Sequence, residues 1–168
     1  MEQQTTSKME IIAQFLSSAE QFVAAVRELP EHSLDCAAAQ GEWTIRQIVH
    51  HVSDDADAWC FAFKKAIASP GAPLRFEGFP GNERWFAALG FGERPAGAAL
   101  DLILSHRRLM AEVAAYAEPA LDEAFLEVFD DKGSSMGRWH AGQILEMLTG
   151  HTLQHLETVR SIRQKNGW

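Results

Sequence analysis

The stretch Gly150-His151-Thr152-Leu153-Gln154-His155 decides how this chain folds. It lies within residues 141–162, where apolar residues recur at helical spacing. At about 100° per residue, both histidines fall inside the apolar stripe. Two inward imidazoles one helical turn apart can share a metal ion, which satisfies both rings at once. The alternative is a pair of independent core histidines, each hydrogen-bonded to a carbonyl or a carboxylate. The spacing favours the metal.

Three further stretches carry the same helical periodicity. Thr44 is the expected N-cap of the second stretch, and Pro30 and Pro70 end the first and the second. Together with the C-terminal run, these stretches predict helices over about residues 6–27, 44–69, 96–116 and 138–164. Helices with one inward apolar stripe each indicate an all-α fold, a four-helix bundle formed by a single domain over residues 1–168.

The connections between these helices are less regular. Residues 31–41 form a polar link with little expected structure beyond a turn, and residues 125–129 read as a short extended segment before a turn. Residues 70–95 are broken by proline and glycine, with a short helix expected over 82–89. This long connection is rich in aromatic side chains, which either pack onto the bundle surface or form a lid over one end of a pocket: Phe76, Phe79, Trp85, Phe86 and Phe91.

The composition excludes several classes of function. The chain carries 15 basic against 23 acidic residues, a net charge of −8, whereas nucleic acids and anionic membrane surfaces require a basic face. Cys36 and Cys60 are too few for a disulfide framework. No uninterrupted apolar run is long enough to span a membrane, and no signal peptide opens the chain. We therefore expect a cytoplasmic protein.

The second predicted helix carries two adjacent histidines that its rotation separates. Relative to the apolar stripe, His51 lies on a flank that can reach the bundle interior. His50 lies about 160° from the centre of the stripe, so we expect it to face solvent or another subunit. His106, near the stripe of the third helix, is the residue that could replace His51 beside the C-terminal pair.

Several chemistries of helical bundles are excluded by sequence. A di-iron carboxylate site needs Glu-x-x-His, which is absent, and a zincin protease needs a glutamate where Thr152 follows His151. An all-histidine site remains, formed by His151, His155 and a facing histidine, best His51. Three neutral imidazoles would leave Zn²⁺ or Ni²⁺ with open positions, the arrangement of a catalytic rather than a structural site. Such an ion can activate a water molecule or a thiol.

Two segments resemble motifs of the DinB/YfiT-like family. Residues 42–54 (EWTIRQIVHHVSD) are similar to its helix-two motif, with His51 rather than His50 in the ligand position. Residues 148–155 resemble its helix-four H-x-x-x-H motif, which matches His151 and His155. The resemblance implies a four-helix bundle, a mononuclear zinc or nickel site and a homodimer. It also implies transfer of low-molecular-weight thiols such as bacillithiol, mycothiol or glutathione, although members are widely labelled metal-dependent hydrolases.

We therefore expect a metal-dependent enzyme that transfers a low-molecular-weight thiol to a small electrophilic substrate. A metal-dependent hydrolase and a non-catalytic, metal-stabilised binding module are the alternatives. Asp55, one turn after His51, and Glu146, five residues before His151, are the candidates for a catalytic base. Asp55 could instead orient His51. Apolar walls for the substrate are expected from Trp59, Phe63 and Trp85.

Overall fold

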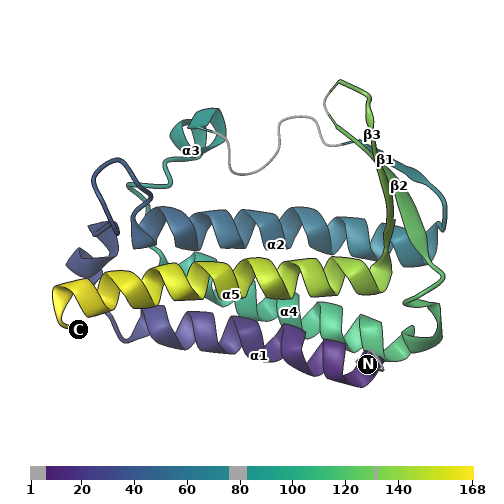
Figure 1. Ribbon diagram of the computed structural model, residues 1–168, viewed down its shortest axis with the longest axis horizontal. Helices are drawn as coiled ribbons and strands as arrows, with labels where there is room; N and C mark the ends of the chain where they lie inside the picture. The colour runs from purple at the N-terminus through teal and green to yellow at the C-terminus, as the bar shows by residue number, and fades with distance from the viewer. Residues whose placement is uncertain (1–6, 76–82, 131) are drawn as a thin grey trace, which may run out of the picture.

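The computed structural model describes residues 7–75, 83–130 and 132–168. Four long helices form a bundle, which confirms the predicted fold class. They are α1 (Lys8–Arg27), α2 (Ile45–Ala68), α4 (Gly97–Tyr116) and α5 (Ala141–Asn166). In the bundle, α1 and α2 each pack against both α4 and α5 (Figure 1).

The helices do not simply alternate in direction. In Figure 1, α2 and α4 run one way along the bundle, and α1 and α5 run the other way. The first residue of α1, Lys8, accordingly pairs with Glu118 and Asp122, just beyond the end of α4. The connection from α2 to α4 must return along the whole bundle, and it contains strand β1 (Pro73–Arg75) and the short helix α3 (Glu83–Leu89).

Local sequence signals explain where the helices begin. Ser7 and Glu10 form a capping box at the start of α1, and the predicted N-cap Thr44 forms one with Gln47 at the start of α2. The link between these helices holds a short 3-10 helix, Glu31–Asp35, more structure than the turn expected there.

A small sheet at one end of the bundle was only partly predicted. Strand β2 (Phe125–Phe129) is the expected extended segment. It lies between β1, with which it pairs in parallel, and β3 (Ser135–His140), with which it pairs antiparallel. The prediction that the last helix begins near residue 138 is therefore wrong. Trp139 and His140 pair with β2 instead, and the helix begins at Ala141.

The interior consists of two apolar clusters with polar residues between them. One cluster lies toward the sheet and includes Phe15, Phe63, Met110 and Leu148. The other lies toward the opposite end and includes Phe22, Ile48, Ile103 and Leu156. Each of the four long helices contributes at least one buried polar side chain at intermediate height. We call this set the polar layer: Ser18, Ser53, Asp55, Arg107 and Thr152.

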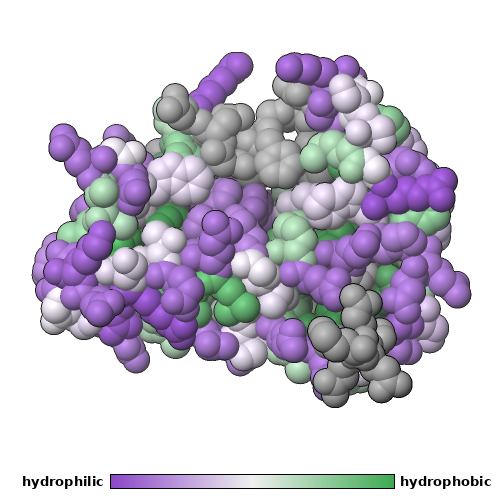
Figure 2. All heavy atoms as spheres, viewed as in Figure 1, coloured by the Kyte–Doolittle hydropathy of each residue, from purple (hydrophilic) through white to green (hydrophobic). Residues whose placement is uncertain are grey.

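The surface is predominantly polar. On the face shown in Figure 2, hydrophilic side chains predominate and the apolar ones form small separate patches. Among the described residues, no helix combines the length and the apolar character that crossing a membrane requires.

Candidate metal centre

Three histidines from two helices converge at one edge of the polar layer. The Nε2 atom of His151 lies 3.0 Å from that of His51 on α2 and 3.0 Å from that of His155 on α5. All three ligand atoms lie within 4.8 Å of one another. The rings meet nearly edge to face, with interplanar angles of 80°, 76° and 87°. The structure thus brings together the three histidines that the sequence singled out.

This geometry fits a single metal ion. An ion about 2.0–2.1 Å from each nitrogen separates its ligand atoms by roughly 3 Å, which is the distance of the His151 Nε2 atom from those of His51 and His155. Burial lowers the pKa of His51 to about 3 and the pKa values of His151 and His155 to about 4. The rings are therefore neutral near pH 7, the form in which imidazole binds a metal.

Asp55 lies directly against the cluster. Its Oδ2 atom is 3.2 Å from Nδ1 of His151, the ring nitrogen that is not directed at the cluster centre. The same oxygen lies 3.9 Å from Nε2 of His51. Burial, and then the charge of Asp54, raise the pKa of Asp55 to about 7, and Arg107 opposes this shift. A carboxylate on the far nitrogen of a histidine is the usual support of a metal ligand.

Two aromatic rings cover one side of the cluster. Phe86 belongs to the aromatic connection from which a lid over a pocket was one expectation, whereas Trp43 was not predicted to be part of the site. The Trp43 ring lies 5.0 Å from that of His51 and stacks over His155 at 6.2 Å. Phe86, on α3, lies 4.4 Å from Trp43 and 6.1 Å from His51. The available signal was the position of Trp43 immediately before the N-cap Thr44, about two helical turns before the first ligand, His51.

The long connection therefore contributes to the site. Its described rings Phe86 and Phe91 are buried against each other, and on α2 Phe86 lies near His51 whereas Phe91 lies near His50. Trp85 donates a 2.5 Å hydrogen bond to Asp54, so this predicted wall residue holds α3 against α2. Phe76 and Phe79 lie outside the described residues.

Other predicted site residues lie apart from the cluster. Phe63 is fully buried in the apolar cluster near the sheet, so the structure does not expose it as the wall for a substrate that the sequence predicted. Trp59 is also buried, with its ring 5.1 Å from that of Trp139. Glu146 is exposed and lines a separate small pocket beside His140, so the structure does not bring this candidate base to the histidines.

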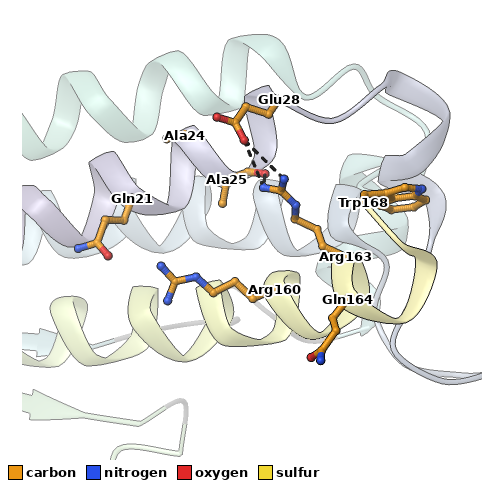
Figure 3. A pocket seen from close by; sticks show the side chains of 8 residues that line it. All are labelled: Gln21, Ala24, Ala25, Glu28, Arg160, Arg163, Gln164 and Trp168. Atoms are coloured by element: carbon orange, nitrogen blue, oxygen red, sulfur yellow. Dashed lines mark hydrogen bonds and ion pairs between the residues drawn. The ribbon is translucent and has the colours of Figure 1, made fainter.

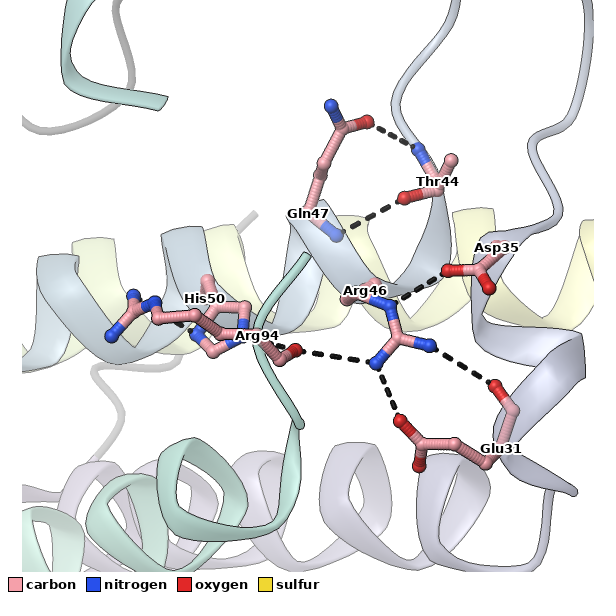
Figure 4. Close-up of polar contacts among 7 residues, drawn as sticks. All are labelled: Glu31, Asp35, Thr44, Arg46, Gln47, His50 and Arg94. Carbon is pink, nitrogen blue, oxygen red and sulfur yellow. Dashed lines mark hydrogen bonds and ion pairs between the residues drawn. The ribbon is translucent and has the colours of Figure 1, made fainter. Parts of the chain in front are cut away.

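The expectation that His50 faces solvent or another subunit is wrong. His50 is buried, with Nε2 3.2 Å from the carbonyl oxygen of Arg94 and Nδ1 3.3 Å from its guanidinium. The same carbonyl accepts a hydrogen bond from Arg46, which also pairs with Glu31 and Asp35 (Figure 4). The chain that precedes α4 covers this face of α2, and helical periodicity cannot reveal such a covering segment.

His106, the competing third ligand, does not join the cluster. Its Nε2 atom lies 3.6 Å from the carboxylate of the exposed Asp57.

The cavity of about 560 Å³ in Figure 3 is separate from the histidine cluster, because residues of α1 and the C-terminal part of α5 line it. In it, Arg163 donates to the carbonyl of Ala25 and pairs with Glu28. A second cavity, of about 550 Å³, adjoins Trp43 and Phe86.

Arg107 is a buried polar residue that was not predicted from the sequence. It lies on α4 with 1% of its surface exposed, and burial lowers its pKa to about 9. Its Nη2 atom donates to the hydroxyl of Thr152 at 2.7 Å and to the carbonyl of Leu148 at 3.3 Å. The signal was its spacing, four residues after Ile103 and three before Met110, within the inward stripe.

Comparisons with known proteins agree with this architecture. A model of the DinB superfamily matches residues 14–159. A Bacillus pumilus protein named "Putative metal-dependent hydrolase" is 27% identical over the whole chain and 92% of its own length. A Bacillus mycoides protein with a similar name is 24% identical over 86% of this chain and 78% of its own. The structure of YfiT from Bacillus subtilis, described as a "probable metal-dependent hydrolase", superposes with a TM-score of 0.77 and 17% identity, covering 100% of this chain and 94% of that one.

Proposed function

The chain belongs to the DinB superfamily, and from that premise we propose that His51, His151 and His155 hold one divalent metal ion, Zn²⁺ or Ni²⁺, at a catalytic centre. The observation that carries this proposal is the convergence of three neutral Nε2 atoms at about the separation that a common ion requires. Three protein ligands leave room for a further ligand, as in catalytic rather than structural sites.

We propose a low-molecular-weight thiol as that further ligand. A divalent ion with imidazole ligands keeps a bound thiol deprotonated at neutral pH. In the transfer, the thiol loses its proton to solvent and its sulfur forms a bond to an electrophilic carbon. The electrons of the bond that breaks depart with the leaving group. Trp43 and Phe86 would supply an apolar wall for the electrophile.

The positions of the nearby carboxylates support this choice of nucleophile. The Oδ2 atom of Asp55 lies against Nδ1 of His151, on the side of that ring away from the cluster centre, and Asp54 accepts the hydrogen bond of Trp85. The candidate base Glu146 lines a separate pocket beside His140 and does not lie at the histidine cluster. A thiol that the ion keeps deprotonated needs no carboxylate base, whereas activation of water for hydrolysis commonly uses one.

Metal-dependent hydrolysis is the second candidate. It is favoured by the names of the relatives and by the 3.9 Å distance between Asp55 and Nε2 of His51, which keeps one carboxylate within reach of the centre. In this alternative Asp55 would accept a proton from water.

The two candidates are separated by assaying one preparation for both reactions. Untagged, metal-loaded protein is incubated with monochlorobimane and, in turn, bacillithiol, mycothiol, glutathione and cysteine. We expect metal-dependent conjugation with one thiol and its loss in His155→Ala. Absence of conjugation with every thiol, together with metal-dependent hydrolysis of ester or amide substrates, would establish the second candidate instead.

A further inference from the structure

The polar layer contains a buried cation, Arg107, whose side-chain hydrogen bonds to the described residues both end on the histidine-bearing helix α5. Arg107 is the only arginine or lysine among the described residues that is as little as 1% exposed. Burying a guanidinium is costly unless its environment compensates the charge, so a position at the centre of the bundle calls for an explanation.

The hydrogen bonds of Arg107 end on one turn of α5. Its Nη2 atom bonds the hydroxyl of Thr152 and the carbonyl of Leu148, and these two residues bracket His151. The other side of the guanidinium lies over the Phe15 ring of α1, 4.2 Å from its centroid. Arg107 therefore connects α4 to α1 and to the turn of α5 that carries the middle histidine of the cluster.

An ordinary ion pair does not account for this residue. Within residues 7–75, 83–130 and 132–168, no carboxylate lies within 4.0 Å of Arg107, and its Nε and Nη1 atoms have no hydrogen-bond partner. Asp55 is the carboxylate whose charge acts on Arg107 through the core, and it contacts His151 from the α2 side. The cation and the carboxylate thus approach the same histidine from two different helices.

We propose that Arg107 is a positioning residue for the metal centre, which sets the place of His151 by holding the Leu148–Thr152 turn of α5. The proposal rests on the proposed metal-binding function. Groups that orient metal ligands typically contribute a factor of about 10 to 100 in metal affinity, although they touch no metal themselves.

A positioning role of Arg107 and simple repulsion by its charge predict opposite changes in metal affinity when Arg107 is replaced by a neutral residue. A cation beside the site repels a divalent ion, so charge alone predicts that its loss would tighten metal binding. Loss of a positioning contact instead leaves His151 less well placed and weakens binding. The sign of the change in affinity therefore decides between the two roles.

The test measures binding of Co²⁺, whose visible absorption reports the geometry of its ligands. The variants are Arg107→Met, Arg107→Lys and Thr152→Val, and affinities come from competition with a chromophoric chelator. We expect Arg107→Met and Thr152→Val to weaken Co²⁺ binding about 10- to 100-fold and to alter the spectrum. Arg107→Lys, which retains a donor and the charge, should recover part of the affinity.

Thr149→Val is the matched control. Thr149 is a buried threonine on the same helix whose hydroxyl bonds Leu145 and not Arg107, so this variant should bind Co²⁺ like the unmodified chain. If Arg107→Met does not fold, Thr152→Val alone tests the positioning role, because it removes only the hydroxyl that accepts the hydrogen bond of Arg107. Unchanged or tighter binding in Thr152→Val, with an unchanged spectrum, would overturn the proposal. An unmodified chain that binds no Co²⁺ would refute the metal centre itself.

Discussion

At the scale of single residues, burial and neighbours separate side chains of the same type. His50 and His51 are adjacent and both buried, but His50 bonds Arg94 whereas His51 meets two other histidines. Asp54 and Asp55 likewise have different partners: Asp54 accepts a hydrogen bond from Trp85, and Asp55 faces His151. Each pair supplies a variant and its own control.

Removing His51 should abolish stoichiometric metal binding, because two imidazoles remain where three converge. His50→Ala should leave the metal content unchanged and lower the stability of the fold, since it breaks the contacts with Arg94. Elemental analysis and thermal unfolding of both untagged variants measure the two effects. Full metal content in His51→Ala would show that His51 is not a ligand.

Asp55→Asn should weaken metal binding about 10- to 100-fold, because the amide removes the negative charge that faces Nδ1 of His151. The neighbouring variant Asp54→Asn weakens the contact with Trp85 and removes a charge that raises the pKa of Asp55, but it leaves the carboxylate that faces His151 in place and should not weaken metal binding. Chelator competition measures both affinities. Equal losses in the two variants would indicate a general loss of packing instead of a specific role for Asp55.

The three histidines could be predicted from the sequence because helical rotation directs all of them inward. The burial of His50 could not be predicted, because the segment before α4 that covers it is distant along the chain and has no helical periodicity. Trp43 and Arg107 carried a positional signal, but their roles depend on which residues of other helices they meet. Such contacts between helices follow from packing and are not encoded in local periodicity.

At the scale of elements, α5 shows where local pattern and tertiary pairing compete. Its apolar spacing predicts a helix from about residue 138, yet residues 138–140 pair with β2 and the helix starts at Ala141. Strand pairing of this kind joins segments that no local window contains, so β1 and β3 were not predicted, whereas the strand-forming run Phe125–Phe129 was. The helix itself carries two glycines in very different surroundings.

Gly150→Ala should stabilise the protein by about 0.5–1 kcal/mol, since alanine is the better helix former. Gly150 is exposed, and a Cβ there would meet nothing within 4 Å. Gly142→Ala should destabilise it, because its Cβ would lie 3.3 Å from the carbonyl oxygen of Leu121. Urea unfolding measures both changes. A destabilised Gly150→Ala would mean that the space beside His151 is needed for another purpose.

At the scale of the whole molecule, the bundle encloses neutral histidines and polar side chains between two apolar clusters. A ligand that binds only the folded chain adds stability, so removal of the metal should lower the melting temperature. The stability of the metal-free protein should also depend on pH, and the pKa shifts of its buried groups determine the direction of that dependence.

Acidification should destabilise the metal-free protein. The cluster histidines have pKa values of about 3 to 4 in the folded chain against 6.5 when unfolded, so as the pH falls from 7 to 5 the excess of protons bound by these histidines in the unfolded chain rises toward three. The pKa of Asp55, about 7 when folded and 3.8 when unfolded, offsets one of these. Unfolding near pH 5 therefore takes up a net of about two protons, so acid favours the unfolded chain. The melting temperature should fall as the pH is lowered from 7 to 5. A constant or rising value would contradict the neutral cluster.

Anomalous X-ray diffraction can show directly whether the three histidines of α2 and α5 hold one metal ion. Crystals of untagged protein are measured on both sides of the absorption edge of the metal that elemental analysis identifies. We expect a single anomalous peak per chain, between the Nε2 atoms of His51, His151 and His155. A fully loaded protein with no peak there, or with its peak beside His106 and Asp57, would contradict it.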